Sequence, residues 1–433
     1  MKRIFVHISV KKTVNAIFDQ LDYEGLFHRL HGEGIKDCPN LGNQVWLQGL
    51  VSEITTQDVQ YDFLEEDTTV EQINENYDLM IFPTANIFST EHIKRLEELA
   101  ERFSQIKIPI YVISCGAQAD SYAELNQLCD SIGDVARKFI DAVYQSGGEF
   151  GLRGYFTKEF FDKLGFHSAE VTGCPSLYQM GRNLHIEKPN IQEKDLKPVI
   201  NGHYHFLNMK FFQKIFDDYE NAVYVDQDYF GRKLYDPTYP GYDHVNFKWF
   251  LQQIRQGKYT ELELLTKDRV LLFSDMPNWR EYLIKEQYNF SFGGRIHGNI
   301  LSILSGIPAI VYGCDSRTRE MAEFYDIPTI SRQELDKKKS LFELYEELDY
   351  TKFNQSFAEK YDKYEDFFIR HGILSQLNSE NIFFNEKYSR NGQKPEIINQ
   401  DKICHVGKEM QKHKNLYKAL NAGVDIARSI KNN

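Results

Sequence analysis

One segment says more about the fold of this chain than any other: YNFSFGGRIHGNI, residues 288–300. An apolar run leads into two glycines, an arginine, a histidine and a further glycine, and the apolar run that follows ends at Gly306. Pro308 then opens another β-branched run, residues 309–312. This order predicts a strand, a helix and a second parallel strand, with the N-terminus of the helix at the carboxyl edge of a sheet.

The residue types at this turn suit an anion-binding site. A helix N-terminus offers free N–H groups and a favourable dipole, and Gly293 and Gly294 let the backbone approach a ligand closely. Arg295 supplies a planar guanidinium for phosphate or carboxylate, and His297 can carry and release a proton. The alternative is a structural arginine paired with a carboxylate and a histidine bonded to a carbonyl; the joint pattern favours the anion site.

The same alternation of short β-branched runs and helical stretches extends in both directions. Helical stretches fill the gaps, for example Phe247–Ile254, and a polar stretch near residues 180–196 reads as a linker. We therefore predict an α/β chain with two doubly wound, Rossmann-like domains that face a cleft, residues 1–180 and 181–330, followed by a helical C-terminal extension, residues 331–433. The predicted strands are Arg3–Val10, Tyr77–Phe82, Ile108–Ser114, Ala142–Gln145, Pro198–Gly202, Ala222–Asp226, Arg269–Asp275, Tyr288–Phe292 and Ala309–Tyr312.

Composition excludes several classes of function. With 51 Lys and Arg against 63 Asp and Glu the formal net charge is −12, which disfavours nucleic acid as a partner. No apolar stretch approaches the roughly 20 residues of a membrane span, although peripheral membrane contact stays open. The six cysteines are far apart in the sequence and no metal-ligand spacing occurs, so we expect a cytoplasmic protein without a metal.

Several motifs, taken together, resemble the polysaccharide pyruvyl transferase family. The C-terminal signature is GRIHGN (294–299), followed by SGIPA (305–309), DSRT (315–318) and YDIP (325–328). Upstream lie YDLMI (77–81), IPIYVISCGA (108–117), GLRGYFT (151–157) and VTGCPS (171–176). They occur in the order of the family over residues 40–330.

The resemblance implies a glycosyltransferase-B-like pair of domains that transfers the enolpyruvyl group of phosphoenolpyruvate to a sugar as a ketal. The acceptor would be a sugar of a polysaccharide or of a lipid-linked glycan precursor, and no cofactor besides the donor is implied. Arg153, Arg295 and His297 match the residues that hold the donor, with Gly294 in the same turn, and His297 matches the acid. A donor with a carboxylate and a phosphate suits two bidentate arginines.

For three residues the sequence allows two roles each. The family's N-terminal loop carries an acid where this chain has Asn43, which either replaces an acceptor-orienting group or caps a helix predicted over Gln44–Leu50. Arg317 either reaches the acceptor or faces a helix carboxylate such as Glu320. Arg153, just before a helix predicted to open at Thr157, would be a surface arginine if the motif around it were ignored.

The remaining polar candidates receive lesser roles. His203-Tyr204-His205 follows a predicted strand and reads as part of the rim of the cleft, with contact to the acceptor left open. Cys115 and Cys174 read as small apolar turn residues, since no adjacent base is visible.

The extension is expected to contain helices over Leu341–Leu348, Phe353–Ile373 and Leu416–Ile430. It either docks across both domains or mediates self-association, which leaves a homo-oligomer open.

Two other functions remain as alternatives. One is a nucleotide-sugar glycosyltransferase of the same architecture, with Arg295 and the helix end holding a diphosphate. The other is a noncatalytic glycan-binding relative, which the Asn43 substitution and the 14% aromatic content favour.

Overall fold

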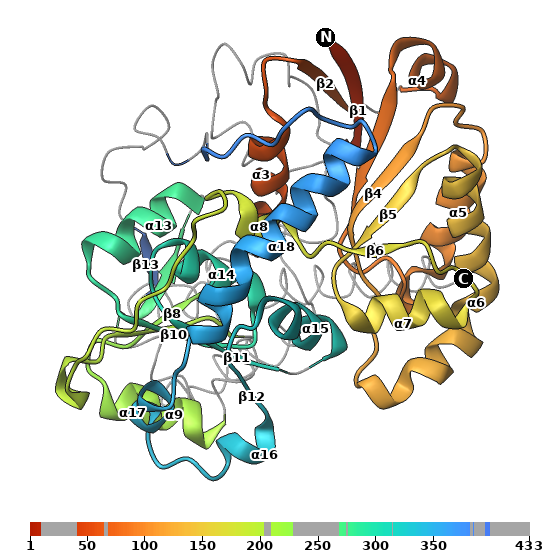
Figure 1. Cartoon of the computed structure of the whole chain (residues 1–433). Helices are drawn as coiled ribbons and strands as arrows, with labels where there is room; N and C mark the ends of the chain where they lie inside the picture. The colour runs from red at the N-terminus through yellow and green to blue at the C-terminus, as the bar shows by residue number, and fades with distance from the viewer. Residues whose placement is uncertain are drawn as a thin grey trace, which may run out of the picture.

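A computed structural model describes residues 1–9, 41–64, 68–202, 209–227, 268–273, 276–313, 315–381, 384 and 395–398. Within these residues the chain forms two largely parallel sheets, each covered by helices, and a long helix, α18 (Thr351–Arg370), crosses between them (Figure 1). The predicted α/β architecture with two Rossmann-like domains is confirmed. Phe247–Ile254, His203-Tyr204-His205 and Leu416–Ile430 lie outside the described residues.

The first sheet has the strand order β2-β1-β3-β4-β5-β6, and its neighbouring strands are parallel. Every residue of β3 and β4 is buried, as expected for parallel strands that helices cover on both faces. The strands are β1 (Lys2–Ser9), β2 (Val59–Leu64), β3 (Leu79–Pro83), β4 (Ile110–Cys115), β5 (Glu149–Leu152) and β6 (Glu170–Val171). The helices of this half are α3 (Gly42–Ile54), α4 (Val70–Asn76), η1 (Thr90–His92), α5 (Ile93–Phe103), η2 (Tyr122–Glu124), α6 (Leu125–Gln145), α7 (Tyr155–Lys163) and α8 (Pro175–Tyr178).

Two predictions in the first half are wrong. Ala142–Gln145 is the last turn of α6 and not a strand, because Ala136, Phe139 and Val143 continue the buried stripe of that helix. The strand comes after the turn at Gly147, whose φ is +84°. Helix α7 begins at Tyr155, two residues before the predicted Thr157.

The second sheet has the order β12-β11-β10-β7-β8-β9-β13, and β13, which the extension supplies, pairs antiparallel with β9. The five predicted strands are present, most of them shorter at their ends. The strands are β7 (Pro198–Ile200), β8 (Val223–Val225), β9 (Val270–Leu272), β10 (Phe290–Gly293), β11 (Ala309–Tyr312), β12 (Thr329–Ile330) and β13 (Glu396–Ile398). The other helices are η3 (Glu193–Asp195), α9 (Lys210–Asp218), α13 (Met276–Lys285), α14 (Ile296–Leu304), α15 (Ser316–Tyr325), α16 (Arg332–Leu335) and α17 (Leu341–Glu346).

Strand order also fixes where a ligand can bind. In the second sheet the chain order reverses between β7 and β10, and open α/β sheets bind ligands outside the carboxyl ends of the strands at such a point. Strand β10 ends at Gly293, so the predicted anion turn follows directly at this switch point.

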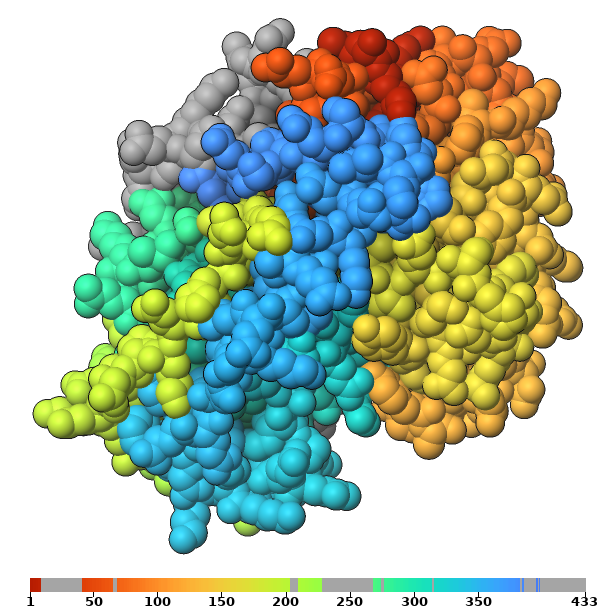
Figure 2. All heavy atoms as spheres, viewed as in Figure 1, coloured from red at the N-terminus to blue at the C-terminus, as the bar shows by residue number. Residues whose placement is uncertain are grey.

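The described part of the extension docks across both sheets. Tyr364 of α18 donates to Glu53 Oε2 of α3 at 2.7 Å, and Asp362 accepts two hydrogen bonds from Arg182 at 2.6 and 2.8 Å. Figure 2 shows this blue segment lying over the seam between the two halves of the molecule. Glu53 is fully buried, and burial raises its pKa well above the usual value. The contact that joins the two halves of the molecule is therefore largely apolar and contains one hydrogen-bonded carboxyl group.

Gly49 of α3 should be intolerant of a side chain. A Cβ there would lie 2.6 Å from the carbonyl oxygen of Pro175, a backbone atom of α8 that cannot move away by rotation. We expect Gly49→Ala to lower the free energy of unfolding by about 1–3 kcal/mol. Gly133→Ala in α6 is the control, because its Cβ would meet side-chain atoms at 3.2 Å and beyond and helix propensity favours alanine. Denaturant unfolding of both variants checks this; equal losses would contradict it.

Candidate active site

The turn between β10 and α14 is built by close approach of two backbones. Gly293 has φ +150°, and a Cβ on it would lie 2.0 Å from the carbonyl oxygen of Asn201 at the end of β7. Arg295 donates its backbone N–H to that same oxygen at 2.9 Å. Arg295 is the N-cap residue of α14, so His297 lies in the first turn of the helix. The glycine therefore allows β7 to hold the start of α14 in place.

Four polar side chains that the sequence interpretation missed support this turn. Asn201 donates to Ser291 Oγ at 2.9 Å, Ser291 donates to Asn299 Oδ1 at 2.8 Å, and Asn299 donates to the carbonyl of Gly293 at 2.8 Å. Gln227 donates to Asn201 Oδ1 at 3.2 Å. All four are buried. Their positions could have indicated this role, because Asn201, Gln227 and Ser291 lie in or next to predicted strands.

Arg153 reaches the same region from the first sheet. It follows β5, and its backbone N–H donates to the carbonyl of Cys115 at 2.8 Å. The β4–β5 pairing has a bulge at Ser114, whose φ is +62°, and bulges of this kind redirect side chains near sites. Ser114 Oγ accepts from both Nε and Nη2 of Arg153 at 3.4 Å. Arg153 is 1% exposed, so the surface alternative is wrong.

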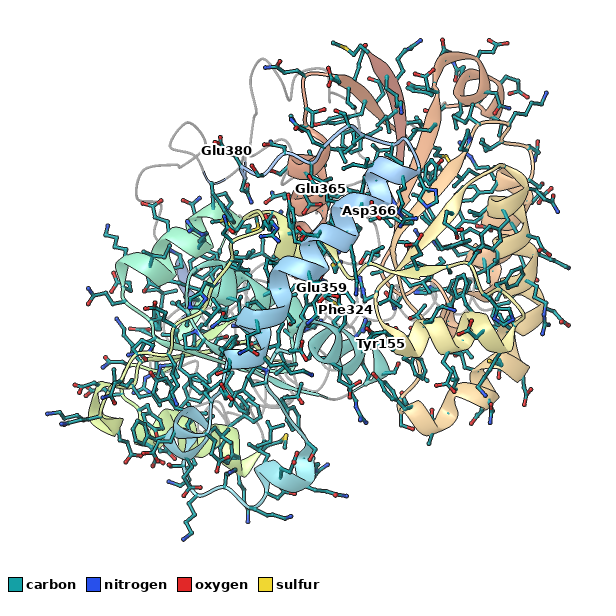
Figure 3. The ribbon with its side chains drawn as sticks, viewed as in Figure 1. Tyr155, Phe324, Glu359, Glu365, Asp366 and Glu380 are labelled. Carbon is teal, nitrogen blue, oxygen red and sulfur yellow. The ribbon has the colours of Figure 1, made fainter. Side chains whose placement is uncertain are left out.

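Glu320 of α15 connects the two domains beside Arg153. Its carboxylate accepts from the backbone N–H and the hydroxyl of Thr157 at 3.0 Å, so it caps α7 from the other domain. The same two helices also pack through aromatic rings: Tyr155 of α7 lies against Phe324 of α15, with ring centroids 6.0 Å apart (Figure 3). Burial raises the pKa of Glu320 to about 8, against the opposing effects of Thr157 and Arg153. Burial therefore favours the protonated form of Glu320, which weakens its compensation of the charge of Arg153.

Arg317 pairs with a helix carboxylate, which is one of its two predicted roles, but the partner is Asp315 and not Glu320. It donates to Oδ2 of Asp315, the N-cap residue of its own helix, at 2.9 Å, and its side chain is 31% exposed. Contact with the acceptor, the other role, stays a prediction.

His297 lies among these arginines. Its side chain is 9% exposed, and its pKa is held well below the usual value, first by burial and then by the charges of Arg153, Arg317 and Arg295. The fold thus brings the predicted arginines together around the predicted histidine. Burial and these charges favour the neutral imidazole, and an anion bound beside the ring would favour the protonated form.

Asn43 does not cap a helix. Helix α3 begins at Gly42 with Leu41 as its N-cap residue and without a side-chain cap, so Asn43 lies in the first turn and is half-buried. The backbone N–H of Leu41 donates to the carbonyl of Gln227 at 2.9 Å. This end of α3 therefore adjoins the polar group that supports Arg295, and an acceptor role for Asn43 stays a prediction.

The two turn cysteines differ. Cys115 packs in the apolar core of the first domain, as predicted for a small apolar residue. Cys174 has a base beside it, since its Sγ lies 3.8 Å from Nε2 of His297. The expectation that neither cysteine has an adjacent base is wrong for Cys174, because the two residues are 123 positions apart in the sequence.

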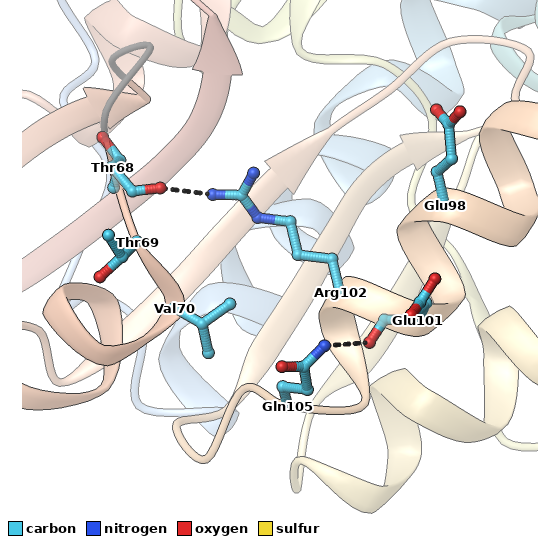
Figure 4. A pocket seen from close by; sticks show the side chains of 7 residues that line it. All are labelled: Thr68, Thr69, Val70, Glu98, Glu101, Arg102 and Gln105. Atoms are coloured by element: carbon cyan, nitrogen blue, oxygen red, sulfur yellow. Dashed lines mark hydrogen bonds between the residues drawn. The ribbon is translucent and has the colours of Figure 1, made fainter.

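A hollow of about 360 Å³ lies apart from these residues (Figure 4). Arg102 in its wall donates to the carbonyl of Thr68 at 2.9 Å. The negative charges of Glu98 and Glu101 disfavour the binding of an anion there. Its lining residues are Thr68, Thr69, Val70, Glu98, Glu101, Arg102 and Gln105.

Searches for other kinds of site were limited to the residues that the structure describes. Among them, no group of three or more His, Cys, Asp or Glu residues could hold a metal ion. None of the helices in that part of the chain is long and apolar enough to span a membrane.

Fold and site together define a class: two Rossmann-like domains with arginines gathered around a histidine at the switch point of the second sheet. The profile of one family, polysaccharide pyruvyl transferase, matches residues 73–316, more than half of the chain. The chain belongs to this family. No curated protein matches it in sequence.

Solved structures of similar overall shape are distant. The complex of MnaA from S. aureus with UDP has a TM-score of 0.43 at 11% identity, over 88% of this chain and 100% of that one. A putative UDP-N-acetylglucosamine 2-epimerase from Listeria monocytogenes also has a TM-score of 0.43 at 11% identity, over 87% of this chain and 98% of that one.

Glu320 should make the stability of the protein depend on pH. Its pKa is about 8 in the folded protein against 4.5 in a model peptide, so its contribution is fully present below pH 4.5 and is lost as the pH rises to about 8. We expect the wild type to lose on the order of a few kcal/mol relative to Glu320→Gln over this range. Thermal unfolding of both proteins at a series of pH values measures it; parallel curves would show that the carboxyl group does not titrate in this way.

Proposed function

We propose that this protein transfers the enolpyruvyl group of phosphoenolpyruvate to two hydroxyl groups of one sugar, in a polysaccharide or lipid-linked glycan precursor, and forms a pyruvate ketal. One observation carries the proposal. The guanidinium of Arg153 is 1% exposed and has no ion pair within the described part of the chain, yet it lies close enough to His297 to lower the pKa of the imidazole.

Such a guanidinium favours an anionic ligand. A buried charge without a partner costs several kcal/mol, and the long contacts to Ser114 offset little of this cost. Phosphoenolpyruvate carries a carboxylate at one end and a phosphate at the other. Arginines bind both groups with paired N–H donors, so Arg153 and Arg295, from opposite sheets, suit the two ends of this donor.

Donor binding would also change the state of His297. The negative charges of the donor oppose the arginine charges that keep the imidazole neutral, so the pKa of His297 rises and the ring takes up a proton. The imidazolium then gives a proton to the methylene carbon, which makes C2 electrophilic.

The rest of the reaction follows from that proton transfer. A sugar hydroxyl forms a bond to C2 and loses its proton, and the C2–O bond to phosphate breaks with its electron pair on the phosphate. Inorganic phosphate is released in that step, and a second hydroxyl of the same sugar then adds to C2 and loses its proton, which closes the ketal.

We assign the acceptor to the side of the site that carries Asn43 and Arg317, because both are partly accessible and begin helices of opposite domains. We also propose the cytoplasm as the compartment, which the free thiols of Cys115, Cys129 and Cys174 support.

Thermal shift with candidate donors tests the proposal. Phosphoenolpyruvate should stabilise the wild type, and a nucleotide sugar should not. Arg295→Lys should weaken donor binding by about tenfold, because an ammonium cannot replace the planar fork. Arg319→Lys is the matched control, since Arg319 lies on α15 but pairs with Glu323 at the surface. Stabilisation by the nucleotide sugar alone would indicate a glycosyltransferase, and silence from both ligands a noncatalytic glycan-binding relative.

Replacement of His297 by alanine should abolish transfer and leave the fold intact. The arginines remain, so phosphoenolpyruvate should still raise the melting temperature of this variant, which separates loss of the acid from loss of binding. Phosphate release and the mass of the glycan product report turnover. Near-normal turnover in His297→Ala would remove the acid assignment.

A further inference from the structure

The backbone of Cys174 is held by a single side chain of the other domain. The hydroxyl of Tyr325, on α15, accepts from the N–H of Cys174 at 2.6 Å and donates to its carbonyl at 2.7 Å. Gly173, with φ +84°, makes room for this contact, because a Cβ there would lie 2.4 Å from the Tyr325 hydroxyl. Pro175, the residue after Cys174, is the first residue of α8, and its ring restricts the backbone there. Little freedom remains in where the cysteine side chain points.

The thiol of Cys174 lies between a hydroxyl and the imidazole. Ser176 Oγ donates to Sγ at 3.2 Å, and Sγ lies 3.8 Å from Nε2 of His297, within the range of hydrogen bonds to sulfur. Cys174 is fully buried. When the neutral ring carries its proton on Nε2, Nε2–H can donate to Sγ, and it can do the same when the ring is protonated, so the contact persists in either charge state of His297.

The other ring nitrogen of His297 remains available. Within the described residues Nδ1 has no hydrogen-bond partner, and it is not among the fully buried polar atoms that lack one. Of the two ring nitrogens, Nε2 faces the thiol, and Nδ1 is therefore the one that is left for a ligand.

We propose that Cys174 is a positioning residue for His297: its thiol holds Nε2, so that Nδ1 is the nitrogen that exchanges a proton with the reactants. The role in transfer rests on the proposed function. With the ring protonated, Nε2–H faces Sγ and Nδ1–H faces the donor. Transfer of the Nδ1 proton to the methylene carbon leaves a neutral ring with its remaining proton on Nε2. The lone pair on Nδ1 can then take the proton of the incoming hydroxyl, and the thiol neither gains nor loses a proton.

Kinetics of Cys174 variants test the role in transfer. Cys174→Ala should lower kcat by about tenfold, as expected for loss of one orienting hydrogen bond, and leave KM for phosphoenolpyruvate unchanged. In the pH profile of kcat, the limb that reports the ionisation of His297 should move to a different pH. Cys174→Ser should restore part of the rate. Cys115→Ala is the matched control, because Cys115 is equally buried but its side chain packs in the other core. A Cys174→Ala enzyme with wild-type kcat and pH profile would overturn the proposal.

Nitrogen NMR of ring-labelled histidine tests the contact without any turnover. In the wild type the two ring nitrogens of His297 should have well-separated shifts, because one tautomer dominates. Cys174→Ala should move them toward averaged values, and Cys115→Ala should not. Unchanged shifts in Cys174→Ala would overturn the contact. If the shifts move as expected and the wild type transfers no pyruvyl group, the proposed function fails and the positioning of His297 stands.

Discussion

The charge of Arg153 is the constraint around which the site is arranged. A guanidinium that is almost completely buried needs compensation, and the described surroundings supply the hydroxyl of Ser114, whose backbone is strained, and the carboxyl group of Glu320, in which burial favours the protonated form. None of these neutralises the cation. His297 lies within reach of this charge, and its pKa is lowered first by its own burial and then by the charge of Arg153. The site therefore has a positive potential that favours anions before any ligand binds. A ligand that supplies negative charge favours protonation of His297 as it binds.

Strand order explains how residues far apart in the sequence reach one place. Arg153 follows β5 of the first sheet, whereas Arg295 and His297 follow β10 at the switch point of the second. Helix α15 joins the halves: its Ser316 and the backbone of Ala119 exchange hydrogen bonds at 3.0 and 3.2 Å. Glu320 and Tyr325 of the same helix hold α7 and the turn at Cys174. One helix of the second domain thus positions three segments of the first.

The sequence was sufficient wherever local pattern determines structure. β-Branched runs predicted most strands, and the glycine pair before Arg295 predicted a close backbone approach that Gly293 and Asn201 make. Prediction failed at Ala142–Gln145, where an apolar helix end has the composition of a strand, and at Asn43, where the helix begins two residues earlier than an Asn43 cap would require. Glu320 and Cys174 could not be assigned from one sequence, because their partners Thr157 and His297 are 163 and 123 positions away. Pairings of that range depend on how the two sheets meet.

The carboxyl group that caps α7 has a consequence for how the chain can be divided. Helix α7 draws an end group from a helix that comes after more than a hundred further residues, so neither half is complete alone. A fragment that stops near residue 180 would leave the amide and hydroxyl of Thr157 without an acceptor, and the complementary fragment would expose Glu320 to water. The two halves should consequently melt in one cooperative transition, and a chimera with half of a relative would inherit a mismatched seam unless residues on both sides were exchanged together.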